Sequence, residues 1–302
     1  MSGRDPRLEG LHEGRERFLA LIAATRPELH RYCARMVGSV TDGEDIVQDT
    51  LARAYYALSQ MEELPPLRPW LFRIAHNRAL DHLRRYERRM GDPFDAVADA
   101  EAVDADDPGD VLAHAEAVDS AISRFLELAP AQRSCVILKD VLEHSLEEIA
   151  ALLEMSVPAV KAALHRGRAH LLERRAADAA PAEMPREPSP ALARYAALFN
   201  ARDWDGVRAM LAEDVRLDLV SRSQRVGRRL VGGYLANYGR LHDWHLRPVW
   251  LEGREVIAAF RDPDDARPGY FIELTLVDGK VSAIRDFRYA AYVASEAAIR
   301  IG

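Results

Sequence analysis

Arginine and aromatic side chains recur at helical spacing in one stretch of the chain, on a helix that we expect to begin near Pro69. Guanidinium groups bind phosphates in a bidentate manner, so a row of them about one turn apart can follow a DNA backbone. Trp70 and Phe72 flank the start of the helix, where an aromatic ring can stack on an unpaired base. The alternative is a solvated charged face with Trp70 in the core. The candidate residues are Trp70, Arg73, Asn77, Arg84, Arg85 and Arg88.

A second basic group lies far downstream, on a predicted helix-turn-helix. Ser145 and Glu148 have the spacing of a capping box, and Ser156 is expected to cap the next helix, which has Pro158 in its first turn. Glu154 occupies a turn position that usually requires glycine, at a cost of about 1 kcal/mol for a positive φ. A recognition helix presents polar side chains to the major groove and packs an apolar back on its partner. The outward candidates are Lys161, His165, Arg166 and Arg168, and the inward ones are Val160 and Leu164. An ordinary helical hairpin is the alternative.

An acidic helix precedes the first basic one, and its charges suit a protein partner. The segment from Asp42 to Asp49 is rich in acidic side chains, and Asp42 is expected to cap the helix. The predicted protein-binding residues are Asp45, Gln48 and Asp49. A protein that makes a single DNA contact has no use for two basic helices with such a helix beside the first. The combination therefore indicates a subunit that reads promoters rather than an ordinary repressor.

These motifs fall into separate segments of a chain of 302 residues, which is long enough for two or three domains. The formal net charge is −7, so any nucleic-acid binding must come from local patches. Between residues 91 and 119 acidic residues are frequent and lysine and arginine are absent, which predicts a mobile linker. The predicted segments are a helical domain at 14–90, this acidic linker at 91–119, a helix-turn-helix domain at 120–178, a proline-rich connector at 179–190 and a final domain at 191–302.

The final segment changes from helical to strand-like patterning. Helices are expected at 191–200, 204–211 and 230–238, and strands at 215–220, 244–251, 255–260, 270–277 and 281–287, with a hairpin turn at Asp278-Gly279. Helices followed by an antiparallel sheet make an α+β domain. The candidate pocket residues are Trp204, Tyr234, Tyr238, Trp250 and Tyr270, with simple core packing as the alternative. The candidate acid–base groups are Asp214, Asp218, His242, His245, Asp286 and Arg288, with surface charges as the alternative.

Composition narrows the classes of function. Cys33 and Cys135 lie among apolar helical neighbours and are interpreted as small buried hydrophobic residues. Histidine and cysteine do not occur at metal-ligand spacing, so neither a metal nor a cofactor is expected. The first residues lead into a charged helix, which argues against a signal peptide. Apolar stretches fall short of the roughly 18–20 residues that span a bilayer. We therefore expect a cytoplasmic protein without a membrane partner.

Taken in order, these motifs resemble the extracytoplasmic-function (ECF) sigma factors, a small bacterial class that keeps the second and fourth conserved regions of the sigma-70 family. The resemblance rests on the acidic segment 42–49, on Trp70 to Asn77 with Asp81-His-Leu-Arg-Arg85, and on the helix-turn-helix, and it covers residues 14–177. It implies two all-α domains. It also implies that Asp45, Gln48 and Asp49 dock on the clamp coiled coil of the largest subunit of the bacterial RNA polymerase core. For promoter DNA, it assigns Trp70, Arg73, Asn77, Arg84, Arg85 and Arg88 to the −10 element, and Lys161, His165, Arg166 and Arg168 to the −35 element.

The segment from Arg194 to Asp205, with the order of the elements after it, resembles the SnoaL-like branch of the nuclear-transport-factor-2 (NTF2) superfold. That fold wraps a curved antiparallel sheet around a pocket. A subgroup of ECF sigma factors carries such a domain and is regulated by it, which implies an internal controller and leaves a small-molecule ligand open. The connector and loop motifs of the best-known subgroup are absent: the connector reads Met184-Pro-Arg-Glu-Pro188 and the loop reads Arg222-Ser-Gln-Arg-Val-Gly-Arg-Arg229.

Two other classes of function stay open from the sequence. SnoaL-like pockets can perform acid–base chemistry on polyketide-type substrates, so one alternative is an enzyme. The other is a ligand-responsive helix-turn-helix regulator that never binds polymerase. The acidic docking helix favours the sigma factor, which is not an enzyme, because an ordinary regulator has no use for Asp45, Gln48 and Asp49.

Overall fold

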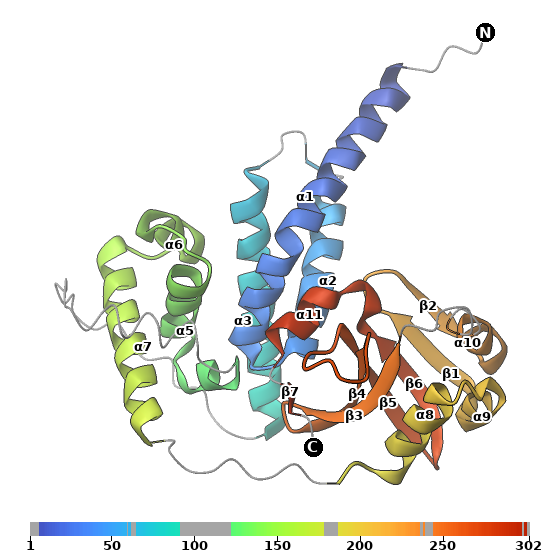
Figure 1. Ribbon diagram of the computed structural model, residues 1–302. Helices are drawn as coiled ribbons and strands as arrows, with labels where there is room; N and C mark the ends of the chain where they lie inside the picture. Colours follow the sequence, from blue (N-terminus) through green and yellow to red (C-terminus); the bar gives the residue numbers. More distant parts are fainter. Residues whose placement is uncertain are drawn as a thin grey trace. The chain divides into compact units, whose positions relative to one another are not determined.

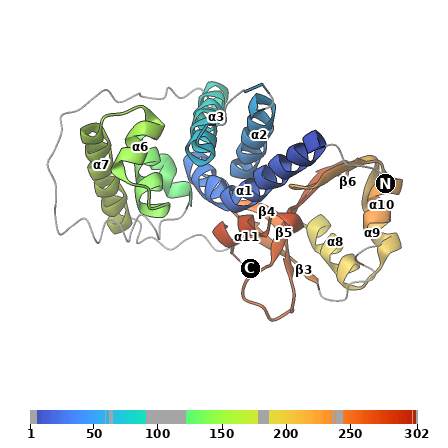
Figure 2. The same cartoon turned by 90° about the horizontal axis from the view of Figure 1, so that it is seen from above.

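The structure is a computed structural model that describes residues 6–58, 60–61, 65–90, 122–177, 187–235, 238, 244–297 and 299–300. The side chains of residues 6–19, 87–90, 174–177 and 299–300 are outside this description. The chain divides into two compact units, Met1–Ala180 and Pro181–Gly302, which appear in both ribbon views (Figures 1 and 2). The predicted acidic linker at 91–119 and most of the predicted connector at 179–190 lie outside the described residues. None of the described helices is long and apolar enough to cross a membrane.

Three long helices form the first half of unit one and lie side by side (Figure 2). Gly43 allows two of them to approach closely, because a Cβ at this position would lie 2.6 Å from the backbone nitrogen of Ala34. The second helix begins earlier than expected, and the hydroxyl of Ser39 accepts a hydrogen bond from the backbone N–H of Asp42 at 3.3 Å. The predicted cap at Asp42 is therefore wrong, because Gly38 with φ 73° turns the chain so soon that Ser39 takes the capping position. The helices are α1 (Pro6–Val37), α2 (Val40–Leu58) and α3 (Leu67–Met90).

The second half of unit one contains the predicted helix-turn-helix, formed by α6 and α7. The capping box is confirmed, since Ser145 Oγ accepts from Glu148 N and Glu148 Oε2 accepts from Ser145 N. Glu154 ends α6 in the left-handed conformation with φ 56°, as the sequence predicted. Ser156 Oγ accepts from Ala159 N at 3.3 Å and caps α7. The elements are η1 (Ile122–Glu127), α5 (Pro130–Val136), η2 (Ile137–Val141), α6 (Leu146–Leu153) and α7 (Val157–Ala177).

A single hydrophobic core joins both halves of unit one. The hydroxyl of Tyr32 lies 2.7 Å from Nδ1 of His76 and 3.2 Å from Oγ of Ser134, so α1, α3 and α5 meet at one point. Arg133, buried in α5, donates to the carbonyl oxygens of Met36, Leu126 and Leu128. The two helical regions therefore pack against each other through apolar and polar contacts alike.

Unit two is an α+β domain in which helices precede and cover a seven-stranded sheet of order β2-β1-β6-β5-β4-β3-β7. The sheet is mixed, which differs from the antiparallel sheet that we expected, because β1 pairs with β6 in parallel. β2 forms a hairpin with β1, so the returning β6 adds to the free edge of β1 in the same direction. The helices are α8 (Pro190–Asn200), α9 (Trp204–Met210), α10 (Arg228–Leu235) and α11 (Ala291–Glu296), with the short turn η4 (Phe287–Tyr289) before the last.

The strands follow the predicted pattern closely, apart from the unexpected short β2 and β7. The turn at Asp278-Gly279 is confirmed, with φ angles of 50° and 73°. Asn200 fixes the end of α8 to the sheet, since its side chain donates to Leu246 O and accepts from Leu246 N, both at 2.8 Å. The strands are β1 (Leu211–Leu219), β2 (Ser223–Val226), β3 (His245–Leu251), β4 (Arg254–Phe260), β5 (Tyr270–Val277), β6 (Lys280–Asp286) and β7 (Ile299–Arg300).

Candidate nucleic-acid interface

Helix α3 presents most of the predicted phosphate-binding side chains to solvent. Exposed positions on it are Arg73, Asn77, Arg84 and Arg85, while the side chain of Arg88 lies outside the description. Trp70 is half-buried and packs against the core. Phe72 is fully buried, with its ring edge-on to those of Tyr32 and His144. The expectation that Phe72 can stack on an unpaired base is therefore wrong, because helices from both halves of unit one enclose the ring.

The predicted protein-binding residues lie along α2. Asp45 is exposed, and Gln48 is half-buried with its amide 3.4 Å from the carboxylate of Glu44. Glu44 itself is fully buried and paired with Arg26 of α1. The ion pair between Arg26 and Glu44 therefore fixes α2, which carries Asp45 and Gln48, to α1.

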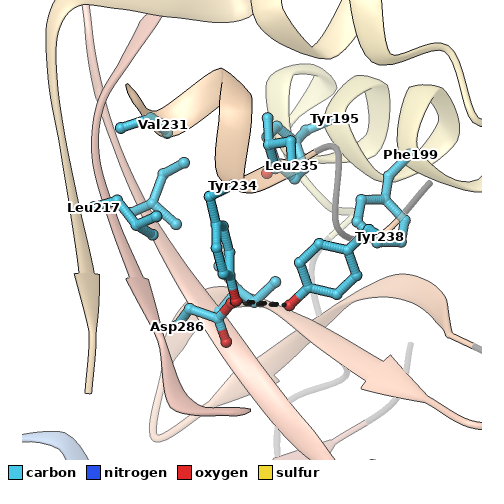
Figure 3. Close-up of a pocket in the computed structure, with 10 residues that line it drawn as sticks. Tyr195, Phe199, Leu217, Val231, Tyr234, Leu235, Tyr238 and Asp286 are labelled. Atoms are coloured by element: carbon cyan, nitrogen blue, oxygen red, sulfur yellow. Dashed lines mark hydrogen bonds between the residues drawn. The ribbon is translucent and has the colours of Figure 1, made fainter. Parts of the chain in front are cut away.

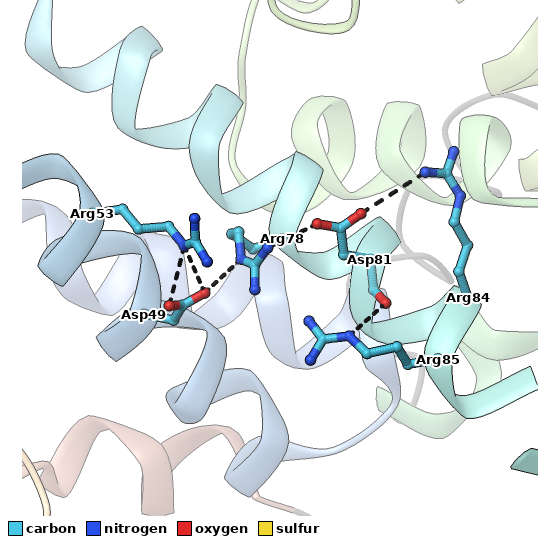
Figure 4. A network of polar contacts seen from close by, with 6 residues as sticks. All are labelled: Asp49, Arg53, Arg78, Asp81, Arg84 and Arg85. Carbon is cyan, nitrogen blue, oxygen red and sulfur yellow. Dashed lines mark hydrogen bonds and ion pairs between the residues drawn. The ribbon is translucent and has the colours of Figure 1, made fainter. Parts of the chain in front are cut away.

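Asp49 belongs to a network of ion pairs that crosses from α2 to α3 (Figure 4). Its carboxylate accepts from Arg53 Nε at 3.1 and 3.2 Å and from Arg78 Nε at 2.5 Å. Arg78 also pairs with Asp81 at 2.8 Å, and Arg85 Nε donates to the backbone oxygen of Asp81 at 3.2 Å. Arg53 and Arg78 are not among the site residues predicted from the sequence. The i,i+4 spacing of Asp49 and Arg53 was a visible signal, whereas the pairing of Asp49 with Arg78 spans 29 positions and had none.

The second helix of the helix-turn-helix, α7, divides its basic residues between solvent and core. Lys161 and His165 are exposed and Arg166 is half-buried, whereas Val160 and Leu164 are buried as expected. Arg168 does not point outward as predicted. Its guanidinium makes a bidentate pair with the fully buried Asp140, at 2.9 and 2.6 Å, and its side chain is only 12% exposed. The expectation of an outward Arg168 is wrong because a buried carboxylate on η2 holds the side chain.

The two basic surfaces lie close together in this structure. Helix α6 packs against α3, and Arg73 Nη1 lies 3.9 Å from the carboxylate of Glu154 in the turn between α6 and α7. Both side chains are largely exposed, so this contact is a weak, screened one. The surrounding contacts are stronger, since the ring of Phe72 meets His144 and Arg68 lies over Phe72 while it pairs with Glu28.

Two histidines at this junction are held neutral. Burial lowers the pKa of His76 to about 4. Burial also lowers the pKa of His144, and the nearby guanidinium of Arg68 adds to the effect. Desolvation disfavours the charged imidazolium, so both rings are neutral near pH 7, and the ring of His76 contacts the hydroxyl of Tyr32 through Nδ1.

Unit two encloses a small cavity of about 10 Å³ under α10, close to the volume that one water needs. Its polar wall is Asp286, whose carboxylate accepts from Tyr234 at 3.0 Å, from Tyr238 at 2.9 Å and from the backbone N–H of Arg288 at 2.9 Å (Figure 3). Burial raises the pKa of Asp286 above its usual range. The hydroxyl of Tyr270 lies 3.1 Å from that of Tyr238, and burial raises the pKa values of all three phenols.

The predicted pocket residues are thus only partly brought together. Tyr234 and Tyr238 line the cavity, Tyr270 joins through its hydroxyl, and neither Trp204 nor Trp250 is among the lining residues. Trp204 packs edge-on against Phe199. Among the candidate acid–base groups Asp286 lines the cavity, His242 lies outside the described residues, and Asp218 faces Arg285 at 3.9 Å. In the described ranges, acidic, histidine and cysteine side chains do not gather into a group that could hold a metal ion.

Comparison with protein families places both halves of unit one. Residues 21–89 match the model for sigma-70 region 2, and residues 118–171 match the model for sigma-70, region 4. The first segment contains α2 and α3, and the second contains the helix-turn-helix.

Two proteins that the chain resembles in sequence are RNA polymerase sigma factors. The chain is 35% identical over 227 residues to the ECF RNA polymerase sigma factor SigG of Mycobacterium tuberculosis, a match that covers 68% of this chain and 60% of SigG. It is 34% identical over 166 residues to the RNA polymerase sigma factor CnrH of Cupriavidus metallidurans, covering 52% of this chain and 86% of CnrH. A solved structure of the M. tuberculosis extracytoplasmic-function sigma factor SigJ aligns with a TM-score of 0.35 and 22% identity, over 90% of this chain and 98% of SigJ.

Proposed function

This chain belongs to the sigma-70 family of RNA polymerase sigma factors, in the ECF group, and from this premise we propose that it directs a bacterial RNA polymerase core to specific promoters and initiates transcription. The observation that carries the proposal is the pair of basic helices. One lies beside an acidic helix, and the other forms the second helix of a capped helix-turn-helix. We propose that the protein acts in the cytoplasm, where the polymerase works, and that it is not an enzyme.

Promoter DNA is proposed to contact both basic surfaces. On the region 2 surface, Trp70, Arg73, Asn77, Arg84, Arg85 and Arg88 are assigned to the −10 element. On the region 4 surface, Lys161, His165 and Arg166 are assigned to the −35 element, because their side chains are at least partly accessible on α7. Arg168 is removed from this set, since its pairing with Asp140 gives it a role in holding α7 in place.

Polymerase docking is assigned to α2, with Asp45, Gln48 and Asp49 facing the clamp coiled coil of the largest subunit. Asp45 is the most accessible of the three. The domain boundaries that we propose are 14–90 for region 2, 120–178 for region 4 and 191–302 for the C-terminal domain. The segments 91–119 and 179–190 join them.

The C-terminal domain is proposed to modulate the activity of the sigma domains by packing rather than by catalysis. Its cavity has room for about one water molecule, and Tyr234 and Tyr238 fill the space beside Asp286. A polyketide-type substrate needs a far larger pocket, of several hundred Å³. The cavity beside Asp286 is therefore too small for such a substrate, and we propose that the domain acts as an internal controller.

An in vitro run-off assay with core polymerase and a pool of promoter fragments tests the proposal. The full chain is expected to give specific transcripts, and a chain that ends at residue 186 is expected to give the same promoters at a different yield. Failure of the full chain to bind core at low ionic strength would overturn the proposal. The double variant Asp45→Ala with Gln48→Ala is expected to lose core binding while the melting temperature of the chain stays the same.

A further inference from the structure

The ion-pair network around Arg78 connects the proposed docking helix to the proposed DNA-reading helix. Charges alternate along it, from Arg53 and Asp49 on α2 to Arg78 and Asp81 on α3, and on to Arg84 and Arg85 (Figure 4). Arg84 Nη1 lies 3.9 Å from the carboxylate of Asp81, and Arg85 donates to the backbone oxygen of the same residue. The proposed polymerase-facing carboxylate of Asp49 is therefore connected through Arg78 and Asp81 to the proposed DNA-facing Arg84, and Arg85 contacts the backbone of Asp81.

Arg78 occupies the central place in this network. Its guanidinium donates to Asp49 through Nε and to Asp81 through Nη1, so one planar group bridges two helices. Its side chain is 19% exposed, compared with 40% for Asp49 and 45% for Asp81. Partial burial lowers the local dielectric, and ion pairs in such surroundings are screened less than surface pairs. Arg78 is itself too enclosed to reach a DNA backbone as freely as its neighbours do.

The charge on Arg78 also determines whether the carboxylate of Asp81 pairs with the proposed DNA-facing arginines. With Arg78 in place, Asp81 is already paired at 2.8 Å and leaves Arg84 at 3.9 Å, outside hydrogen-bond distance. Without that partner, the carboxylate has Arg84 as its remaining cationic neighbour in the network. It would then draw Arg84 toward itself and compete with DNA phosphates for that guanidinium.

We propose that Arg78 is a positioning residue that couples docking on the polymerase core to reading of the −10 DNA, because it holds Asp49 and Asp81 in one network. The inference rests on the proposed sigma function and deepens it. It gives Asp49 two roles: its carboxylate contacts the polymerase core, and it also positions the DNA-reading helix through Arg78.

The test uses holoenzyme assembled from the full chain and core polymerase. Two quantities are measured: the affinity of the chain for core, and the affinity of the holoenzyme for a fork-junction DNA that carries the −10 element. Arg78→Gln is expected to leave core affinity nearly unchanged and to weaken fork-junction binding by about fivefold or more, the size of typical couplings between sites. Arg78→Lys, which keeps the charge but not the planar fork, is expected to fall between wild type and Arg78→Gln.

Arg53→Gln is the matched control, because Arg53 pairs with the same carboxylate but stays on α2 and is 55% exposed. It is expected to change fork-junction affinity by less than about twofold. A double-mutant cycle adds a readout that a purely structural role would not move. If Asp49 acts by holding the guanidinium of Arg78 against Asp81, then Asp49→Asn, Arg78→Gln and their combination lose the same amount of fork-junction affinity.

Several outcomes would overturn the inference. Equal behaviour of Arg78→Gln and Arg53→Gln contradicts it, and so do losses from Asp49→Asn and Arg78→Gln that multiply in the double variant. If Arg78→Gln does not fold, the fork-junction affinities of Arg78→Lys and Asp81→Asn are compared with that of Arg53→Gln instead. A wild-type chain that fails to bind core overturns the proposed function together with this inference. A wild-type chain that transcribes while Arg78→Gln reads DNA normally overturns the inference alone.

Discussion

The hydroxyl of Tyr32 lies 2.7 Å from Nδ1 of His76, at the point where the region 2 helices meet the region 4 helices. Ser134 Oγ completes the cluster, 3.2 Å from the tyrosine hydroxyl and 3.3 Å from the same ring nitrogen. Tyr32 and Ser134 are fully buried and the pKa of the imidazole is lowered to about 4, so this polar cluster is compatible with a neutral ring and not with a charged one.

Stability of unit one is expected to fall as the pH is lowered through this histidine's titration range. The unfolded chain takes up a proton on His76 near pH 6.5, whereas the folded protein resists until about pH 4. Between these values the unfolded state binds more protons, which removes up to roughly 3 kcal/mol of unfolding free energy. Denaturant unfolding measured from pH 7 to pH 4 is expected to show a shallower pH slope for His76→Gln than for wild type. Parallel slopes would contradict the assignment.

Two glycines in helices are expected to respond to alanine in opposite ways. A methyl group at Gly43 would lie 2.6 Å from Ala34 N, so Gly43→Ala must push α1 and α2 apart at a cost of about 1–3 kcal/mol. A methyl group at Gly233 in α10 meets nothing within 4 Å, so Gly233→Ala is expected to stabilise by about 0.5–1 kcal/mol. Thermal unfolding of both variants checks the pair, and a destabilised Gly233→Ala would refute the account of α10.

Substitutions at Arg168 and at Lys161, on the same helix, are expected to affect different properties: protein stability at Arg168 and DNA binding at Lys161. Arg168→Met removes both bonds to the buried Asp140 and is expected to cost about 3–5 kcal/mol of stability. Lys161→Met is exposed and is expected to leave stability within about 0.5 kcal/mol. In binding to −35 duplex, Lys161→Met should reduce the salt slope by about 1. The reverse pattern would show that Arg168 is a DNA contact.

The carboxylate of Asp286 is expected to be structural in unit two. Asp286→Ala removes the carboxylate that accepts from Tyr234 and Tyr238 and is expected to cost about 1–3 kcal/mol, because Tyr238 keeps the hydroxyl of Tyr270 as a partner at 3.1 Å. Tyr234→Phe should cost less, because only one hydroxyl is removed and its ring remains. Tyr289→Phe, at 39% exposure, serves as the control and should be neutral. Unchanged thermal unfolding of Asp286→Ala would contradict this role.

If both proposed DNA-reading surfaces contact the promoter, transcription is expected to require that they separate. Arg73 and Glu154 lie 3.9 Å apart at their side-chain ends, too close for the helices to reach two elements spaced along a duplex. Cysteines at both positions, bridged by a reducible bismaleimide, should therefore suppress run-off transcription, and reductant should restore it. Each single cysteine variant is the control, since Cys33 and Cys135 are buried. Full activity of the bridged protein would show that the packed arrangement reads promoters.

Much of the secondary structure was predictable from the sequence because it depends on contacts between residues that are close along the chain. The capping box at Ser145 and Glu148 and the left-handed turn at Glu154 depend on contacts within about one turn of helix, so residue types alone predicted them. The hairpin turn at Asp278-Gly279 follows from the φ angles that only a few residues adopt easily. The hydrophobic period predicted most helices and strands for the same reason.

Partners far apart in the sequence were decided by the tertiary structure. Lys161 and Arg168 look alike in the sequence, but Asp140 on another element holds only Arg168 inside. Asp49 meets Arg78 across 29 positions, and the tyrosines converge on Asp286 from 48 and 52 positions away. The amino-acid sequence determined which side chains carry charge and which face of each helix is apolar. The packing of the helices and the pairing of β6 with β1 decided which of these charges are buried beside an oppositely charged or hydrogen-bonding partner. Such partners are required because removing an unpaired charge from water is energetically costly.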